Sequence, residues 1–112
     1  MTRTFPLTGH AASVVECVSE EILDWQDSPD IAAVVRAFRA GGPYLTSDAP
    51  RRLVVTRAEA EAVADGLCDL ANGEDDMADA NARSNPELAR YNRAGQRGLS
   101  TVRSRVLAWM RS

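Results

Sequence analysis

Four segments of the chain repeat apolar residues at the spacing of an α-helix, and each begins with residues that favour a helix start. The last of them carries its apolar residues on one face and arginines on the opposite face. Together the four segments predict a mainly α fold, a compact four-helix domain. The helices are expected from about Thr8 to Trp25, from Ser28 to Gly41, from Thr56 to Asn72 and from Asn85 to about Met110.

The strongest local signal is the capping box Thr56-Arg57-Ala58-Glu59. In such a box the threonine hydroxyl accepts from the backbone amide three residues on, while the glutamate reaches back to the capping amide. Two other starts, Ser28-Pro29-Asp30 and Asn85-Pro86-Glu87, combine a capping side chain, a proline at the first helical position and an acidic first turn. These signals fix where three of the helices begin.

Between the second and third helices the apolar residues no longer recur at helical spacing. The stretches YLTS and RLVV flank the segment DAPR, which has turn chemistry, and this predicts a short β-hairpin. A five-part α+β layout is the alternative architecture. The polar, acidic stretch 73–84 indicates a loop or a frayed short helix. Gly95 and Gly98 interrupt the last helix, where they favour either the close approach of another helix or a break.

Length and hydropathy limit the class of protein. A chain of 112 residues predicts one domain, 1–112. Its longest apolar runs have five residues, far below the roughly 20 that span a bilayer, so no membrane contact is expected. The first ten residues lack the apolar stretch of a secretory signal, which predicts a cytoplasmic protein. All 13 cations are arginine, and this lysine-free, alanine-rich composition indicates a bacterium of high GC content or its phage.

Residues that carry chemistry are few. His10 is the only histidine, and no serine or cysteine stands in a recognisable pattern with it. Cys17 and Cys68 lie far apart without a nearby second ligand, so we expect buried, reduced thiols rather than a zinc or redox site. The acidic stretch lacks the spacing of a calcium loop, and no phosphate-binding loop occurs. The sequence therefore predicts no enzyme, no cofactor and no metal.

Charge is divided unevenly along the chain, whose formal net charge is −3. Residues 1–82 contain 15 acids and 6 arginines, a balance of −9, whereas residues 83–112 contain one acid and 7 arginines, a balance of +6. The chain thus consists of an acidic part, 1–82, and a basic amphipathic C-terminal helix, 83–112.

Two rows of carboxylates recur at intervals of four residues on the polar sides of the first and third helices. Like charges at this spacing cost a helix about 0.2–0.5 kcal/mol per pair, so they favour a role outside the monomer. Our leading hypothesis is a small non-enzymatic protein-binding factor, of the inhibitor, antitoxin, immunity or anti-defence type, that engages a basic surface of its partner. A solvated helix face, or pairing with the basic helix of the same chain, is the competing interpretation. The rows are Glu16, Glu20 and Asp24, and Glu61, Asp65 and Asp69.

Two alternatives come from the basic helix. Arg90, Arg93 and Arg97 lie on one face and could contact phosphates, as in a DNA-binding transcriptional regulator. A negative total charge and the lack of a recognition-helix pattern argue against nucleic acid. The third interpretation is a helical subunit of a larger bacterial or phage assembly, in which Tyr91, Gly95 and Trp109 form an intermolecular helix pair; a homo-oligomer is open on the same ground.

Overall fold

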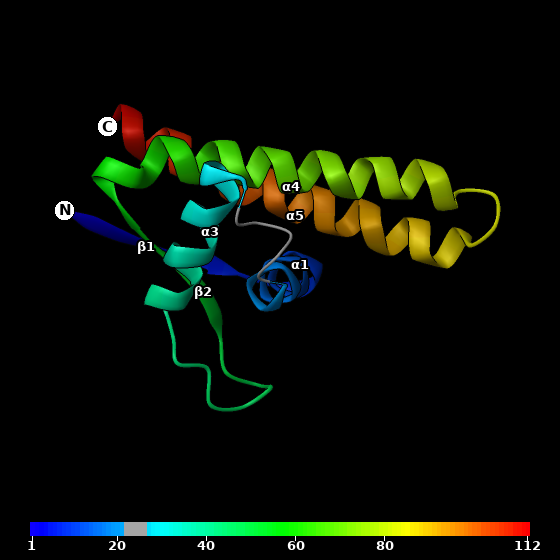
Figure 1. Cartoon of the computed structure of the whole chain (residues 1–112), viewed down its shortest axis with the longest axis horizontal. Helices are drawn as coiled ribbons and strands as arrows, with labels where there is room; N and C mark the ends of the chain where they lie inside the picture. The colour runs from blue at the N-terminus through cyan, green and yellow to red at the C-terminus, as the bar shows by residue number, and fades with distance from the viewer. Residues whose placement is uncertain (22–26) are drawn as a thin grey trace.

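The computed structural model describes residues 1–21 and 27–112 and consists of four helices and a two-stranded antiparallel sheet in that part of the chain (Figure 1). The predicted mainly α class is confirmed. The radius of gyration is 13.6 Å, close to the value of about 13 Å expected for a compact chain of this length. In chain order the elements are β1 Thr2–Leu7, α1 Gly9–Glu20, α3 Pro29–Ala40, β2 Arg51–Thr56, the 3₁₀ turn η1 Arg57–Glu59, α4 Ala60–Asn81 and α5 Pro86–Arg111.

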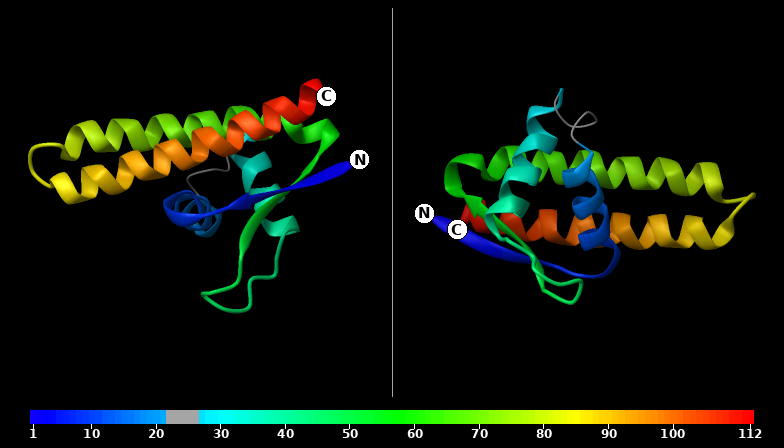
Figure 2. Two further views of the ribbon diagram at one scale, coloured as in Figure 1. Left: turned by 180° about the vertical axis from the view of Figure 1, so that it is seen from behind. Right: turned by 60° about the horizontal axis from the view of Figure 1, so that its bottom comes forward.

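The two longest helices, α4 and α5, lie side by side and antiparallel along the long axis of the molecule (Figure 1). Helices α1 and α3 cross this pair on one side, and the sheet packs beneath the C-terminal half of α5 (Figure 2). The core forms where these layers meet. It contains fully buried side chains from almost every element, among them Val15, Val34, Leu53, Leu67 and Leu99.

The three helix starts marked by capping residues are confirmed. Ser28 Oγ accepts from the Ile31 amide at 3.3 Å, and Asn85 Oδ1 accepts from the Leu88 amide at 3.2 Å. Thr56 Oγ1 accepts from the Glu59 amide at 3.2 Å, which is the first half of the capping box. The Glu59 carboxylate accepts from Arg36 Nε at 3.2 Å instead of capping its own helix.

Two glycines let helices approach each other closely. A Cβ at Gly66 of α4 would collide with the Asp30 carbonyl of α3 and lie 2.6 Å from Val34 Cγ2. A Cβ at Gly98 of α5 would lie 2.8 Å from Ala11 Cβ of α1. Helix α5 is continuous through Gly95 and Gly98, so these residues are packing positions and not a break.

One strand of the predicted hairpin is correct, and the other, the stretch YLTS, is wrong. Strand β2 lies between the second and third helices, as expected, but it pairs with β1, with Thr2 opposite Thr56 and Leu7 opposite Arg51. Phe5 and Leu7 of β1 are buried in the core, whereas Leu45 in the expected partner is 83% exposed. The pairing with β1 is preferred because it removes two large apolar side chains from water.

Tyr44 belongs to the connection before β2 rather than to a strand. Its hydroxyl lies 2.7 Å from the Phe38 carbonyl oxygen and 2.8 Å from the Arg52 carbonyl oxygen, and its ring stacks on Phe38 with centroids 4.6 Å apart. These contacts fasten the end of α3 to β2 and leave Tyr44 unable to serve in a hairpin.

The predicted end of the third helix at Asn72 is also wrong. Helix α4 continues through Gly73 to Asn81, so most of the stretch expected to be a loop or a frayed short helix forms about the last two and a half turns of α4. Ala78 is buried in these turns, and Asp75 and Asp79 form ion pairs with Arg93 of α5. Contacts with α5 therefore outweigh the cost of about 1 kcal/mol for a glycine inside a helix.

Three further expectations concern the end of the first helix, the two cysteines and contact with a membrane. Helix α1 ends at Glu20; Trp25, the expected end, lies outside the described residues. Cys17 is exposed and Cys68 half-buried, so the expectation of buried thiols is wrong for Cys17, whose side chain leaves the polar side of α1. No helix of the described part is long and apolar enough to cross a membrane.

Candidate protein-interaction face

The exposed side of α4 carries a row of carboxylates. Glu61, Asp65 and Asp69 are all exposed and, as the four-residue spacing requires, lie on one side of α4; Asp76 continues the row in the part of α4 that the sequence did not predict. At 3.6 residues per turn these four side chains lie within about 80° of one another around the helix and span about 22 Å along it. We call Glu61, Asp65, Asp69 and Asp76 the α4 acidic face.

The α4 acidic face has no internal counter-charge. Within the described part of the chain, none of its four carboxylates takes part in a hydrogen bond or an ion pair. Beside it, Asp75 and Asp79 share Arg93, whose guanidinium nitrogens lie 3.7 Å and 3.3 Å from their carboxylate oxygens. Six acidic side chains thus project from one side of α4, and a single arginine of α5 neutralises part of that charge.

The first predicted row does not form a comparable face. Glu16 is bound to Arg51 of β2, with Arg51 Nε donating to Glu16 Oε2 at 2.8 Å and a second nitrogen donating to Oε1 at 3.3 Å. The hydrogen bond from Arg51 lowers the pKa of the Glu16 carboxyl from its ordinary 4.5. Glu20 is exposed one turn further along α1, and Asp24 lies outside the described residues.

The Glu16–Arg51 pair gives a pH-dependent contribution to stability. We expect Glu16→Gln to lower the free energy of unfolding by less than about 1 kcal/mol at neutral pH, because the pair is partly exposed. Since the folded-state pKa is lowered, this contribution is complete above pH 4.5 and disappears as the pH falls through the lowered value. Urea unfolding of both proteins at several pH values measures the difference. Glu20→Gln is the matched control, and a deficit in Glu16→Gln that persisted unchanged in acid would contradict this account.

The basic residues of α5 lie next to the acidic end of α4. Arg90, Arg93 and Arg97 are all exposed, but Arg93 is held by the two aspartates of α4. Arg90 and Arg97 take part in no ion pair in the described part of the chain. The predicted basic row is therefore interrupted at its centre by an internal salt bridge.

The residues expected to form an intermolecular helix pair make contacts within the chain. Tyr91 packs against the ring of His10, with centroids 4.0 Å apart. Trp109 meets Phe5 edge to face at 5.9 Å, and Gly95 faces Val14 of α1 and Glu74 of α4. These three residues attach β1 and α1 to α5.

Sequence reasoning missed one polar pair and the length of the acidic face. Glu74 and Asn92 are only 6% and 4% exposed, and Asn92 Nδ2 donates to Glu74 Oε2 at 2.7 Å between α4 and α5. The signal that could have found both features is the spacing of Ala71, Glu74 and Ala78, which continues the buried side of α4 beyond Gly73.

The described residues offer little for metal or thiol chemistry. No group of three histidine, cysteine or acidic side chains is close enough to hold a metal ion in the part of the chain that the structure describes. Partial desolvation and then the neighbouring Glu20, Glu21, Glu16 and Glu74 carboxylates raise the pKa of the Cys17 thiol, which keeps it protonated and weakly nucleophilic.

Comparisons with protein-family models, with curated proteins and with solved structures find no match to this chain.

Proposed function

We propose that this chain is a small non-enzymatic factor that binds another protein, with the α4 acidic face as its contact surface and a basic patch on the partner. The observation that carries the proposal is the row of exposed carboxylates along one continuous helix, without an ion pair from the described residues. The inhibitor, antitoxin, immunity or anti-defence class fits a short chain that would act by covering a basic site.

Electrostatics supports this choice of surface. Glu61, Asp65 and Asp69 repel one another in the free protein, and each adjacent pair costs about 0.2–0.5 kcal/mol. A partner that supplies arginines opposite them relieves the repulsion and forms charge-assisted hydrogen bonds. The same field raises the rate of encounter with a basic surface, an effect that salt screens.

The DNA-binding alternative has less support from the geometry. A duplex laid along Arg90 and Arg97 would bring its phosphates close to Asp75 and Asp79, which already hold the intervening Arg93. Repulsion between these carboxylates and phosphates opposes such a contact. We therefore propose that the partner binds to α4 and not to α5.

Neutralising the face tests the proposal. The variant Glu61→Gln, Asp65→Asn, Asp69→Asn is expected to keep its helical circular dichroism, to melt at or slightly above the wild-type temperature because the repulsion is removed, and to bind the partner at least tenfold more weakly. The partner is first recovered on the immobilised wild-type protein from cells that make it, identified by mass spectrometry and purified. Its affinity is then measured by calorimetry at 50 and 300 mM NaCl, with weaker binding expected at the higher salt.

A second triple variant, Glu20→Gln, Asp27→Asn, Asp48→Asn, provides the control. Its three residues are exposed and lie outside α4, and both triple variants change the net charge from −3 to 0. We expect it to bind as the wild type does. Equal affinity of the two triple variants for the purified partner would refute a specific role for α4.

A further inference from the structure

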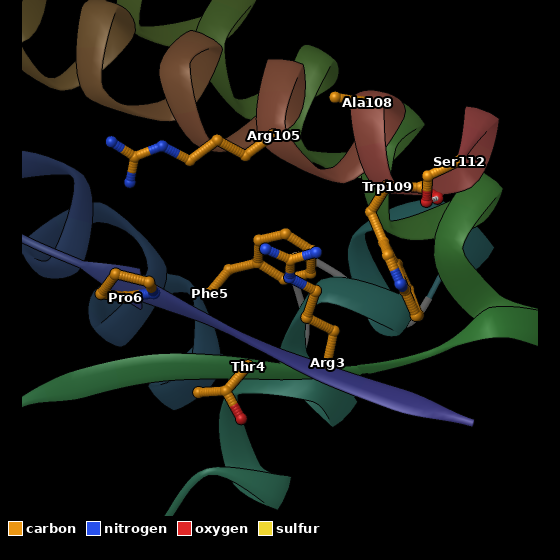
Figure 3. A pocket seen from close by; sticks show the side chains of 8 residues that line it. All are labelled: Arg3, Thr4, Phe5, Pro6, Arg105, Ala108, Trp109 and Ser112. Carbon is orange, nitrogen blue, oxygen red and sulfur yellow. Dashed lines mark hydrogen bonds between the residues drawn. The ribbon is translucent and has the colours of Figure 1, made fainter.

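A pocket of about 430 Å³ lies between β1 and the C-terminal part of α5, on the side of α5 that faces the sheet (Figure 3). Such a volume falls within the range of small-molecule sites. None of its eight lining residues has a carboxylate side chain, although acids outnumber arginines in the chain as a whole. The lining residues are Arg3, Thr4, Phe5, Pro6, Arg105, Ala108, Trp109 and Ser112.

Phe5 and Trp109 form the aromatic floor of the pocket, and Arg57 packs against Trp109. Phe5 and Trp109 meet edge to face, and both are largely buried. The Arg57 guanidinium covers Trp109 at 5.0 Å from the ring centroid and donates to the carbonyl oxygens of Trp109, Met110 and Ser112. These contacts hold Trp109 in place, and a preformed floor lowers the entropic cost of binding.

Two other arginines line the pocket from different elements. Arg3 projects from β1 and lies over Phe5, 5.8 Å from its ring centroid, and Arg105 projects from α5 (Figure 3). Neither forms an ion pair with any carboxylate in the described part of the chain. Both guanidiniums are therefore available to an anion, for which their planar, multiple donors are suited.

The pocket continues past Arg105. A second hollow of about 170 Å³ shares Pro6 and Arg105 with it and adds the hydroxyl-bearing Thr8 and Thr101. Arg105 thus stands between two adjoining spaces, so a ligand longer than a single ring has room on both sides of the guanidinium.

We propose that this pocket binds a small organic anion, a phosphate or carboxylate attached to an apolar or aromatic group. Arg3 of β1 and Arg105 of α5 donate N–H groups to the oxyanion, and the apolar group packs against the parts of Phe5 and Trp109 that line the pocket. This site is independent of the α4 acidic face, because Arg105 projects toward β1 and away from the side of α5 on which Asn92 contacts α4.

Titration with simple probes, followed by ¹H–¹⁵N spectra, tests the site. Phenyl phosphate and benzoate at up to 10 mM are expected to move the indole signal of Trp109, distinguished from that of Trp25 by a Trp25→Phe variant. Comparison of the two anions tells a phosphate site from a carboxylate site, and either preference supports the proposal. Phenol and inorganic phosphate should each bind at least tenfold more weakly than the better anion, because each lacks one of the two recognised groups.

Two double variants distinguish a specific contribution of Arg3 and Arg105 to binding from an effect of net charge. Arg3→Gln with Arg105→Gln should weaken binding of the better anion at least tenfold while the protein keeps its melting temperature. Arg90→Gln with Arg97→Gln removes the same charge from exposed positions of α5 outside the pocket and should change the affinity less than twofold. The proposal is overturned by the absence of any shift at 10 mM for both anions, by equal binding of phenol, or by equal losses in the two double variants.

Discussion

Replacing Gly66 by alanine is expected to lower the free energy of unfolding by about 3 kcal/mol. The added Cβ would meet the Asp30 carbonyl and lie 2.6 Å from Val34 Cγ2, at the point where α3 crosses α4. The backbone of α3 must move to admit it, and Val34 is fully buried, so the shift would disturb the core around it. This loss exceeds the gain of about 1 kcal/mol that alanine brings to a helix.

Gly73 in the same helix provides the matched control, because a Cβ there would meet nothing within 4 Å. Gly73→Ala is expected to raise the free energy of unfolding by about 0.5–1 kcal/mol. Urea unfolding followed by circular dichroism measures both variants. Gly66→Ala as stable as the wild type would show that α3 does not approach α4 as closely as described, and a loss in Gly73→Ala would contradict an open helix surface there.

The second large effect is expected at the buried pair between α4 and α5. Asn92→Ala removes the donor that lies 2.7 Å from Glu74 Oε2 and leaves a carboxylate that is only 6% exposed without its partner. Burial of a charged group without its hydrogen bond costs several kcal/mol, and we expect a loss of about 3 kcal/mol in the free energy of unfolding.

Two comparisons isolate the cause of that loss. Asn72→Ala makes the same change on the exposed side of α4 and should cause no loss of stability. Glu74→Leu combined with Asn92→Leu replaces the pair by apolar side chains and should recover most of the stability that Asn92→Ala loses. If this double variant were less stable than Asn92→Ala, a stranded carboxylate would not be the explanation.

The helices could be predicted from the sequence because their signals are local. Ser28, Thr56 and Asn85 each accept from a backbone amide three residues further on, so the sequence of one turn is sufficient to place a helix start. The end of α4 could not be placed in this way. Gly73 is a common terminator, and contacts with the facing helix, among them those of Glu74, Asp75 and Asp79, keep the chain helical beyond it.

The acidic face was predictable in part, because the spacing of its residues is also a local signal. The spacing of Glu61, Asp65 and Asp69 places them on one side of any helix; that this side is exposed, and not paired with the arginines of α5, only the structure shows. Asp76 was missed because the helix was expected to end before it. Whether Glu16 is free or paired depended on Arg51, which lies on another element and becomes its neighbour only in the folded chain.

The sheet and the α4–α5 pair lose very different amounts of conformational entropy when they form. Helices α4 and α5 are joined by a connection of four residues, 82–85, so their first contacts restrict the chain very little. The two strands meet only when the loop 8–50 closes, and closing a loop of that length costs conformational entropy before any ladder hydrogen bond forms. Burial of Phe5 and Leu7 must offset that cost. The stability of the sheet, and with it of the arginine-lined pocket, therefore depends on the core beneath β1 more than on the hydrogen bonds of a two-stranded ladder.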